Sequence, residues 1–143
     1  MNAMKHTQGK HVFVLNGDTM FRADLPAMYQ FHLEKNSQVT LALRKVQDVS
    51  RYGAVTLREN KSVEAFHEKG ISRGEGLING GIYLMNRLFM LSQGFEEKFS
   101  IEKDFFDKAV TGDQLYGFES EAYFLDIGIP EDYKKAHDEF ERF

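Results

Sequence analysis

The sequence predicts an α/β protein, in which helices pack on a mixed, mostly parallel sheet within a single domain spanning residues 1–143. Short runs rich in apolar and β-branched residues alternate with segments whose apolar residues recur at helical spacing. Both long βα and short ββ connections join these runs, which indicates a mixed sheet. With 143 residues, of which 42% are hydrophobic and 28% charged, the chain is large enough to bury one core.

The first strand is expected at residues 11–15, where a continuous apolar run is typical of a strand buried on both faces of a parallel sheet. Residues 2–6 before it read as the tail of a helix. Residues 24–36 read as the next helix, because Asp24 is a suitable N-cap and Asn36 can end the helix. The chain therefore opens with a strand and a helix that packs on it.

The later elements follow from alternation of apolar residues, from the glycines and from capping residues. Strands are expected at residues 38–46, 54–58, 63–67, 77–85, 114–119 and 122–126. Helices are expected at residues 86–91, at residues 101–110 with Ser100 as N-cap, and from Pro130 onward. Residues 59–61 read as a hairpin turn and residues 70–76 as a loop.

Composition argues against several classes of function. The net charge of −4 speaks against a broad basic surface for nucleic acid. Without cysteine, the chain has neither disulfides nor a thiolate metal site, and its five scattered histidines lack the spacing of a zinc site. No apolar run is long enough to cross a bilayer, and the polar start does not resemble a signal peptide. We therefore expect a cytoplasmic protein without a membrane partner.

Two apolar strands end in an aspartate. The strand at residues 11–15 leads into Asn16, Gly17 and Asp18, and a later strand ends in Asp126. Ligands of open α/β sheets bind at the carboxyl ends of strands, and Mg²⁺ favours one or two carboxylates together with waters and phosphates. The pair predicts a Mg²⁺ site at Asp18 and Asp126, with simple turn chemistry as the alternative for Asn16 to Asp18.

An adjacent acid and base follow the predicted strand at residues 63–67. Glu68 and Lys69 could form a surface charge pair, which contributes little to stability. The functional interpretation places the Lys69 ammonium on a phosphate and the Glu68 carboxylate on sugar hydroxyls. A sugar phosphate needs both kinds of contact.

Two further groups of residues combine polar side chains with glycine. Gly80 and Gly81 interrupt an apolar strand, which predicts a bulge or the close approach of a ligand. Asn79 before them offers a donor and an acceptor to a hydroxyl. Tyr52 and Gly53 precede another strand and could act in the same way.

Taken in order, these motifs resemble the sugar-phosphate nucleotidyltransferase family. The matching stretches are Asn16-Gly17-Asp18, Tyr52-Gly53, Phe66-x-Glu68-Lys69, Asn79-Gly-Gly-Ile-Tyr83, Phe99-Ser-Ile-Glu-Lys-Asp104 and Phe124-Leu-Asp126-Ile-Gly128-Ile-Pro130. The agreement is closest to the D-glycero-α-D-manno-heptose 1-phosphate guanylyltransferases, with the mannose-1-phosphate guanylyltransferases as the nearest rival branch.

The resemblance implies a Rossmann-like nucleotidyltransferase sandwich and a Mg²⁺-dependent reaction. A nucleoside triphosphate, with GTP as the expected donor, and a sugar 1-phosphate give a nucleotide-sugar and pyrophosphate. By resemblance the catalytic residues are Asp18, Lys69 and Asp126, and the two aspartates hold the metal. The residues expected to bind substrate are Asn16, Gly17, Tyr52, Gly53, Glu68, Asn79 and Gly81.

The glycine-rich first motif of that family has no counterpart here, because residues 70–76 lie in the wrong place and read as a loop. The chain thus resembles the C-terminal two-thirds of a nucleotidyltransferase domain, truncated at its N-terminus. We expect feeble or no nucleotidyl transfer by this chain alone. The strand at residues 11–16 is expected to become a sheet edge, covered by self-association in a homo-oligomer or by a second polypeptide.

Three hypotheses remain open at this point. The chain is a guanylyltransferase, either as a truncated domain or as one half of a split enzyme. Alternatively it is a non-catalytic remnant that binds sugar phosphates. A metal-dependent glycosyltransferase fits least well, because that class shows two acids separated by one residue, whereas residues 16–18 offer one acid.

Overall fold

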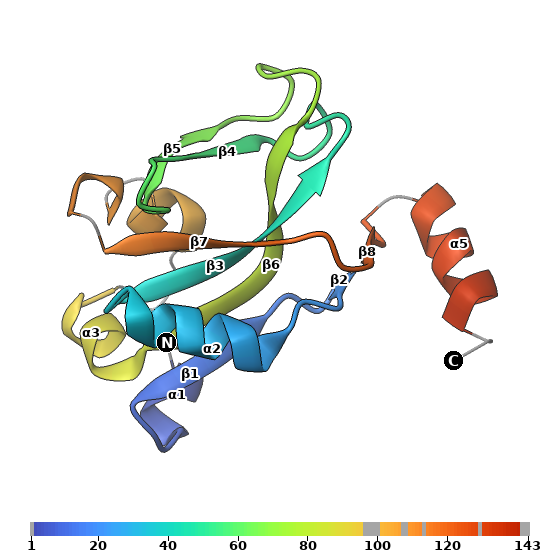
Figure 1. Cartoon of the computed structure of the whole chain (residues 1–143). Helices are drawn as coiled ribbons and strands as arrows, with labels where there is room; N and C mark the ends of the chain where they lie inside the picture. The colour runs from blue at the N-terminus through green and yellow to red at the C-terminus, as the bar shows by residue number, and fades with distance from the viewer. Residues whose placement is uncertain (1, 96–100, 107–108, 113, 129, 141–143) are drawn as a thin grey trace.

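The computed structural model describes residues 2–95, 101–106, 109–112, 114–128 and 130–140 (Figure 1). In chain order the elements are α1 (Asn2–His6), β1 (His11–Leu15), β2 (Thr19–Phe21), α2 (Leu25–Glu34), β3 (Val39–Val46), β4 (Ala54–Leu57), β5 (Val63–His67), β6 (Gly76–Asn86), α3 (Arg87–Ser92), η1 (Ile101–Phe106), η2 (Val110–Gly112), β7 (Leu115–Ser120), β8 (Phe124–Asp126) and α5 (Pro130–Phe140). None of the described helices is long and apolar enough to cross a membrane.

Six strands form the main sheet, in the order β5-β4-β6-β3-β7, with β1 paired to the C-terminal half of β6. Among the strand pairs that the structure describes in this sheet, only β3 and β7 run parallel, and the others are antiparallel. The expectation of a mostly parallel sheet is therefore wrong, although the sheet is mixed as predicted. Short connections such as the β4–β5 hairpin join antiparallel neighbours, whereas a parallel pair needs a long crossover.

The strand β1 differs from the prediction in its burial and in the direction of its pairing. Its residues are half-buried or exposed instead of buried on both faces, and it pairs antiparallel with β6. Among the described strands it has no other neighbour, so it lies at an edge of the sheet, as expected (Figure 1). A continuous apolar run therefore predicted the strand correctly but not its direction or its depth.

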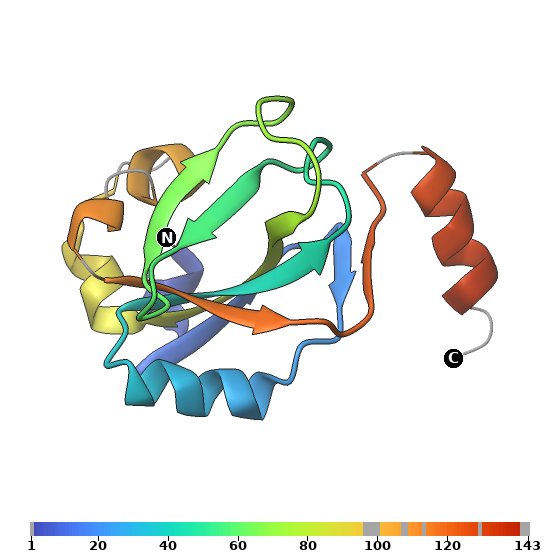
Figure 2. The same ribbon diagram turned by 45° about the horizontal axis from the view of Figure 1, so that its top comes forward.

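Helices cover both faces of the sheet, as the predicted sandwich requires (Figure 2). On one face Met28 of α2 packs with Ala42 and Leu84. On the other face Met90 of α3 and Phe106 of η1 pack in a larger cluster. Met28, Leu84, Met90 and Phe106 are fully buried, so each face has its own core.

Local signals placed several elements correctly. The Asp24 carboxylate accepts a hydrogen bond of 2.9 Å from the amide of Ala27, which confirms the N-cap of α2. Asn36 follows that helix with a φ of 47°, and Lys61 in the β4–β5 turn has a φ of 73°. The helix expected at residues 101–110 differs, because η1 is a π-helical segment and η2 a 3₁₀ turn. Ser100, its expected N-cap, and Phe99 of the fifth motif lie outside the described residues.

Candidate functional site

The paired glycines of β6 form a bulge, one of the two outcomes that the sequence predicted. In the pairing with β3, Leu41 lies opposite Tyr83 and Leu43 opposite Asn79, so the ladder shifts register across the glycines. Gly81 has a φ of +74°, a conformation that favours glycine. The bulge bends β6 where the connection between β1 and β2 passes.

That connection, rather than a ligand, occupies the space beside the glycines. A Cβ on Gly81 would lie 2.7 Å from Thr19 Oγ1 and 2.9 Å from Asn16 Nδ2, and a Cβ on Gly80 would meet the ring of Phe21. The Asn16 amide donates a hydrogen bond of 2.8 Å to the carbonyl of Gly81. The glycines thus hold the segment that carries Asp18 against the sheet.

The side chain of Asn79 stabilises the same bulge from within. Its Nδ2 donates to the hydroxyl of buried Tyr83 at 2.9 Å, and its Oδ1 accepts from the amide of Gly81 at 3.1 Å. Both the donor and the acceptor that the sequence assigned to a sugar hydroxyl therefore have partners inside the chain. The role of Asn79 in sugar binding stays a prediction.

The two aspartates lie next to each other along the backbone of a small second sheet. In the antiparallel pair of β2 and β8, Thr19 lies opposite Asp126. The amide of Ile127 donates to the carbonyl of Asp18 at 3.0 Å. The Asp18 side chain is exposed, and Asp126 is half-buried with its Oδ1 accepting from the amide of Gly128 at 2.8 Å. Pairing of β2 with β8 thus brings together the backbones of two residues that the sequence linked by their similar positions after apolar strands.

Tyr52, Gly53, Glu68 and Lys69 form a second group. Gly53 has a φ of +79°, and a Cβ there would lie 2.6 Å from the carbonyl oxygen of His67 and 3.5 Å from the amide nitrogen of Lys69. The side chains of Glu68 and Lys69 are exposed. The segment before β4 therefore packs directly on the segment after β5.

Tyr52 connects the two groups. Its ring contacts that of Phe124 edge-to-face, with 5.9 Å between ring centres, and Phe124 lies in β8 two residues before Asp126. Burial raises the pKa of Tyr52, the Arg51 charge opposes that shift, and the Asp126 carboxylate adds to it. The predicted site residues thus form one neighbourhood, linked by a series of contacts. The series runs from Gly81 through Asn16 to Asp18 and Asp126. It continues through Tyr52 and Gly53 to Lys69.

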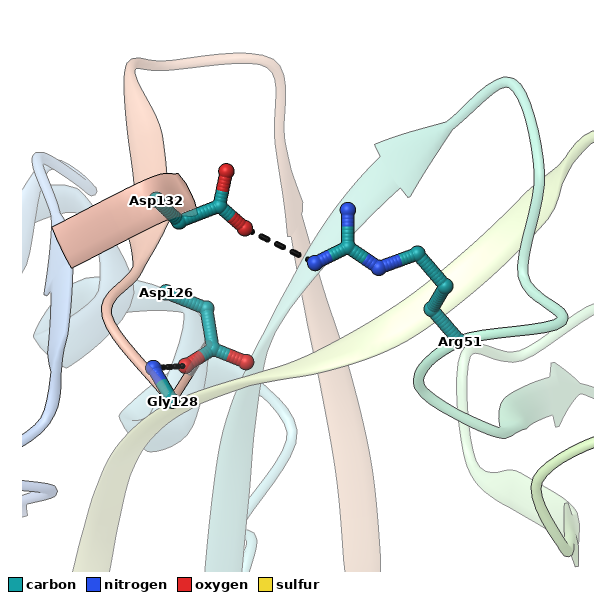
Figure 3. Close-up of polar contacts among 4 residues, drawn as sticks. All are labelled: Arg51, Asp126, Gly128 and Asp132. Carbon is teal, nitrogen blue, oxygen red and sulfur yellow. Dashed lines mark hydrogen bonds and ion pairs between the residues drawn. The ribbon is translucent and has the colours of Figure 1, made fainter. Parts of the chain in front are cut away.

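Sequence reasoning missed Arg51 and Asp132 in this neighbourhood. Arg51 Nη2 lies 2.8 Å from Asp132 Oδ2, and the Arg51 guanidinium lies over the Tyr52 ring at 5.3 Å from its centre. In Figure 3 Asp126 and Asp132 both lie facing Arg51. The hydrogen bond that Arg51 donates to Asp132 is the main cause of the raised pKa of Arg51, and the charge of Asp126 contributes. The sequence offered only one signal, the position of Asp132 in the first turn of a helix.

Asp18 and Asp126 offer carboxylates, the type of ligand that a magnesium ion prefers. No group of three or more acidic, histidine or cysteine residues able to hold a metal occurs in the described part of the chain. Mg²⁺ is commonly held by one or two carboxylates, with phosphates and waters completing its shell. Asp18 and Asp126 are adjacent along the backbone of the β2–β8 pair, and Asp18 is exposed, so the Mg²⁺ site that the sequence predicts remains a prediction with suitable ligand types.

Comparisons with known proteins show which proteins this chain is similar to. A family model described as nucleotidyl transferase matches residues 1–142. The chain is 42% identical over 141 residues to a D-glycero-alpha-D-manno-heptose 1-phosphate guanylyltransferase of Aneurinibacillus thermoaerophilus, covering 99% of this chain and 60% of that protein. It is 35% identical to a mannose-1-phosphate guanyltransferase of Schizosaccharomyces pombe, covering 85% of this chain and 34% of that protein.

Solved structures agree with the sequence comparison. The crystal structure of HddC from Yersinia pseudotuberculosis complexed with GMP-PN superposes with a TM-score of 0.84 at 36% identity, covering 97% of this chain and 59% of that chain. The chain therefore spans about three-fifths of the heptose 1-phosphate guanylyltransferase and of HddC, and about one-third of the mannose-1-phosphate guanyltransferase.

Proposed function

The chain belongs to the nucleotidyl transferase family, and from this premise we propose that it takes part in guanylyl transfer from GTP to a sugar 1-phosphate of the heptose or mannose type. An oxygen of the sugar phosphate attacks the α-phosphorus of GTP, the bond from that phosphorus to the β-phosphate oxygen breaks, and pyrophosphate leaves. Support comes from relatives named for such guanylyl transfers, and from the HddC complex with GMP-PN.

The proposal gives each group of residues a distinct task. Asp18 and Asp126 would hold Mg²⁺, and the ammonium of Lys69 would bind the phosphate of the sugar. Glu68 would accept hydrogen bonds from sugar hydroxyls. Asn79, whose side chain also bonds to Tyr83 and to the Gly81 amide, would add a contact to a sugar hydroxyl. The remaining proposed contacts to substrate come from Asn16, Gly17, Tyr52, Gly53 and Gly81.

This chemistry relies on positioning and charge rather than on a covalent intermediate. Bound Mg²⁺ would offset the negative charge that develops on the phosphoryl oxygens. The chain's own residues would orient the attacking phosphate, since holding two reactants in line removes a large entropic part of the barrier. The exposed Lys69 would neutralise the acceptor phosphate as it approaches the triphosphate.

One observation carries the proposal: the β2–β8 pairing sets Asp126 opposite Thr19, beside Asp18, while Phe124 of the same strand contacts Tyr52. Two aspartates at a strand pair and an exposed lysine, Lys69, on the segment that packs on Gly53 suit a metal and an anionic substrate. A second candidate is sugar-phosphate binding without catalysis, or action as one half of a split enzyme. It needs only the side chains of Glu68 and Lys69, which are both exposed.

Calorimetry and a pyrophosphate-release assay on the same protein separate these functions. In the calorimeter, the protein is titrated with mannose 1-phosphate or with D-glycero-α-D-manno-heptose 1-phosphate, each with and without Mg²⁺. The protein is then incubated with each sugar phosphate and GTP, and the released pyrophosphate is measured. Turnover that Asp18→Asn and Asp126→Asn abolish supports the transferase. Binding without turnover supports the second candidate, and absence of both binding and turnover contradicts both.

A further inference from the structure

The connection between β3 and β4 bridges the two groups of predicted site residues. On one side the amide of Gly70, directly after Lys69, donates a hydrogen bond of 3.1 Å to the carbonyl of Ser50. On the other side the ring of Tyr52 contacts an aromatic ring of β8. Arg51 is the residue between these two contacts, so its backbone is held next to both the Lys69 segment and β8.

The guanidinium of Arg51 keeps most of its donors available. An arginine side chain carries five N–H donors and no acceptor. Among the residues that the structure describes, its hydrogen-bond partner is Asp132, which accepts from Nη2 at 2.8 Å. The Arg51 side chain is 51% exposed, and its guanidinium lies over the Tyr52 ring, 5.3 Å from the ring centre. The remaining N–H groups can therefore donate to a ligand while Asp132 keeps its bond.

The proposed metal ligand Asp126 faces the same guanidinium. In Figure 3 the carboxylates of Asp126 and Asp132 both lie toward Arg51, and the dashed line marks the bond to Asp132. The charge of Asp126 adds to the raised pKa of Arg51, after the larger effect of the bond to Asp132. A phosphate bound to a metal at Asp126 would therefore bring its negative charge into the space that Arg51 faces, where the guanidinium would offset it.

We propose that Arg51 is a further substrate-binding residue, whose guanidinium donates hydrogen bonds to the phosphate of the sugar 1-phosphate. This inference rests on the proposed function, and it gives that phosphate a second cation beside Lys69. The two cations differ in what they offer. Lysine is a point charge, whereas the planar guanidinium donates two parallel hydrogen bonds to two oxygens of one phosphate. Arg51 would therefore fix the orientation of the phosphate, and Lys69 would contribute charge.

A matched pair of variants separates phosphate binding from the link to α5. Arg51→Gln and Asp132→Asn each replace one charged partner by an amide, and both remove the same ion pair. An exposed ion pair contributes little to stability, so both variants should fold and should unfold at similar temperatures. Only Arg51→Gln also removes the cation that we assign to the phosphate.

Calorimetric titration with mannose 1-phosphate and with D-glycero-α-D-manno-heptose 1-phosphate, in the presence of Mg²⁺, measures the difference. We expect Arg51→Gln to bind roughly ten- to a hundredfold more weakly than the unchanged chain, because charge-assisted hydrogen bonds are lost. Asp132→Asn should bind at least as tightly as the unchanged chain, since no carboxylate then competes for Arg51. Arg51→Lys keeps the charge without the planar donor pair, so its affinity should lie between those of Arg51→Gln and the unchanged chain.

Three results would overturn the role of Arg51 and leave the proposed function standing. Equal losses of affinity in Arg51→Gln and Asp132→Asn would assign the effect to the link with α5. Unchanged affinity in Arg51→Gln would remove the contact altogether. Weaker binding of GTP with unchanged binding of both sugar phosphates would place Arg51 at the phosphates of the nucleotide. If the unchanged chain binds neither sugar phosphate, the proposed function itself fails, and the role of Arg51 fails with it.

Discussion

The guanidinium of Arg51 and the carboxylate of Asp132 form an ion pair of 2.8 Å that ties the connection between β3 and β4 to the first turn of α5. The helix α5 stands apart from the main sheet and otherwise packs chiefly on β8 (Figure 1). Since β8 ends in Asp126, this ion pair helps to fix the helix that follows the proposed metal ligand.

Replacing Asp132 should loosen α5 with little effect on the rest of the fold. An exposed ion pair contributes at most about 1 kcal/mol, so Asp132→Asn should lower the free energy of unfolding by no more than that. The amides of α5 should exchange severalfold faster, because one of its few links to the sheet is gone. Asp138→Asn, an exposed acid on the same helix, serves as the control. Equal exchange rates in the two variants would contradict a tethering role.

Gly81 should not tolerate a side chain. Alanine at a φ of +74° is strained, and its Cβ would lie 2.7 Å from Thr19 Oγ1. We expect Gly81→Ala to lower the free energy of unfolding by about 2 kcal/mol or more, measured by urea denaturation. Gly17→Ala is the matched control, since nothing lies within 4 Å of a Cβ at that position. It should change stability by less than about 0.5 kcal/mol. A similar loss in both variants would contradict the bulge as the cause.

The contact between His32 of α2 and His11 of β1 should make stability depend on pH. His32 is 1% exposed, with its Nε2 2.9 Å from His11 Nδ1 and its Nδ1 2.8 Å from Thr40 Oγ1. Burial, followed by the charges of His11 and Lys10, lowers the pKa of His32 from 6.5 to about 4. The unfolded chain therefore takes up the proton first as the pH falls.

The stabilisation from neutral His32 is complete above pH 6.5 and is lost as the pH falls from 6.5 toward 4. The full loss is on the order of 3 kcal/mol for a shift of this size. Urea denaturation at a series of pH values measures it, with His6→Gln as the control because His6 is exposed. His32→Leu should be less stable at pH 7.5 but should lose less stability on acidification. An unchanged pH slope in that variant would assign the effect to another group.

Lys69 should contribute to substrate affinity without contributing to stability. Its side chain is exposed at the end of the segment that packs on Gly53. Removing a charge-assisted bond to phosphate should weaken binding of mannose 1-phosphate by roughly ten- to a hundredfold in Lys69→Met. Lys134→Met, on the exposed face of α5, should bind as the unchanged chain does. Equal affinities for both variants would remove Lys69 from the proposed site.

The sequence by itself determined the local structure and the family. The Asp24 cap, the turn at Lys61 and the helix after Pro130 depend on interactions between near neighbours in the chain, so their residue types predict them. The motif that contains Asp18 could be recognised for the same reason, since it occupies a few consecutive residues.

Only the tertiary structure decided which distant segments meet. It set the antiparallel direction of β1, created the short strand β2 by pairing it with β8, and filled the space beside Gly81 with the chain's own Asn16 and Thr19. It also joined Arg51 to Asp132 across 81 residues. Strand pairing and such contacts depend on the free energy of the whole packed arrangement, in which partners far apart in the chain compete, and no local pattern records the outcome.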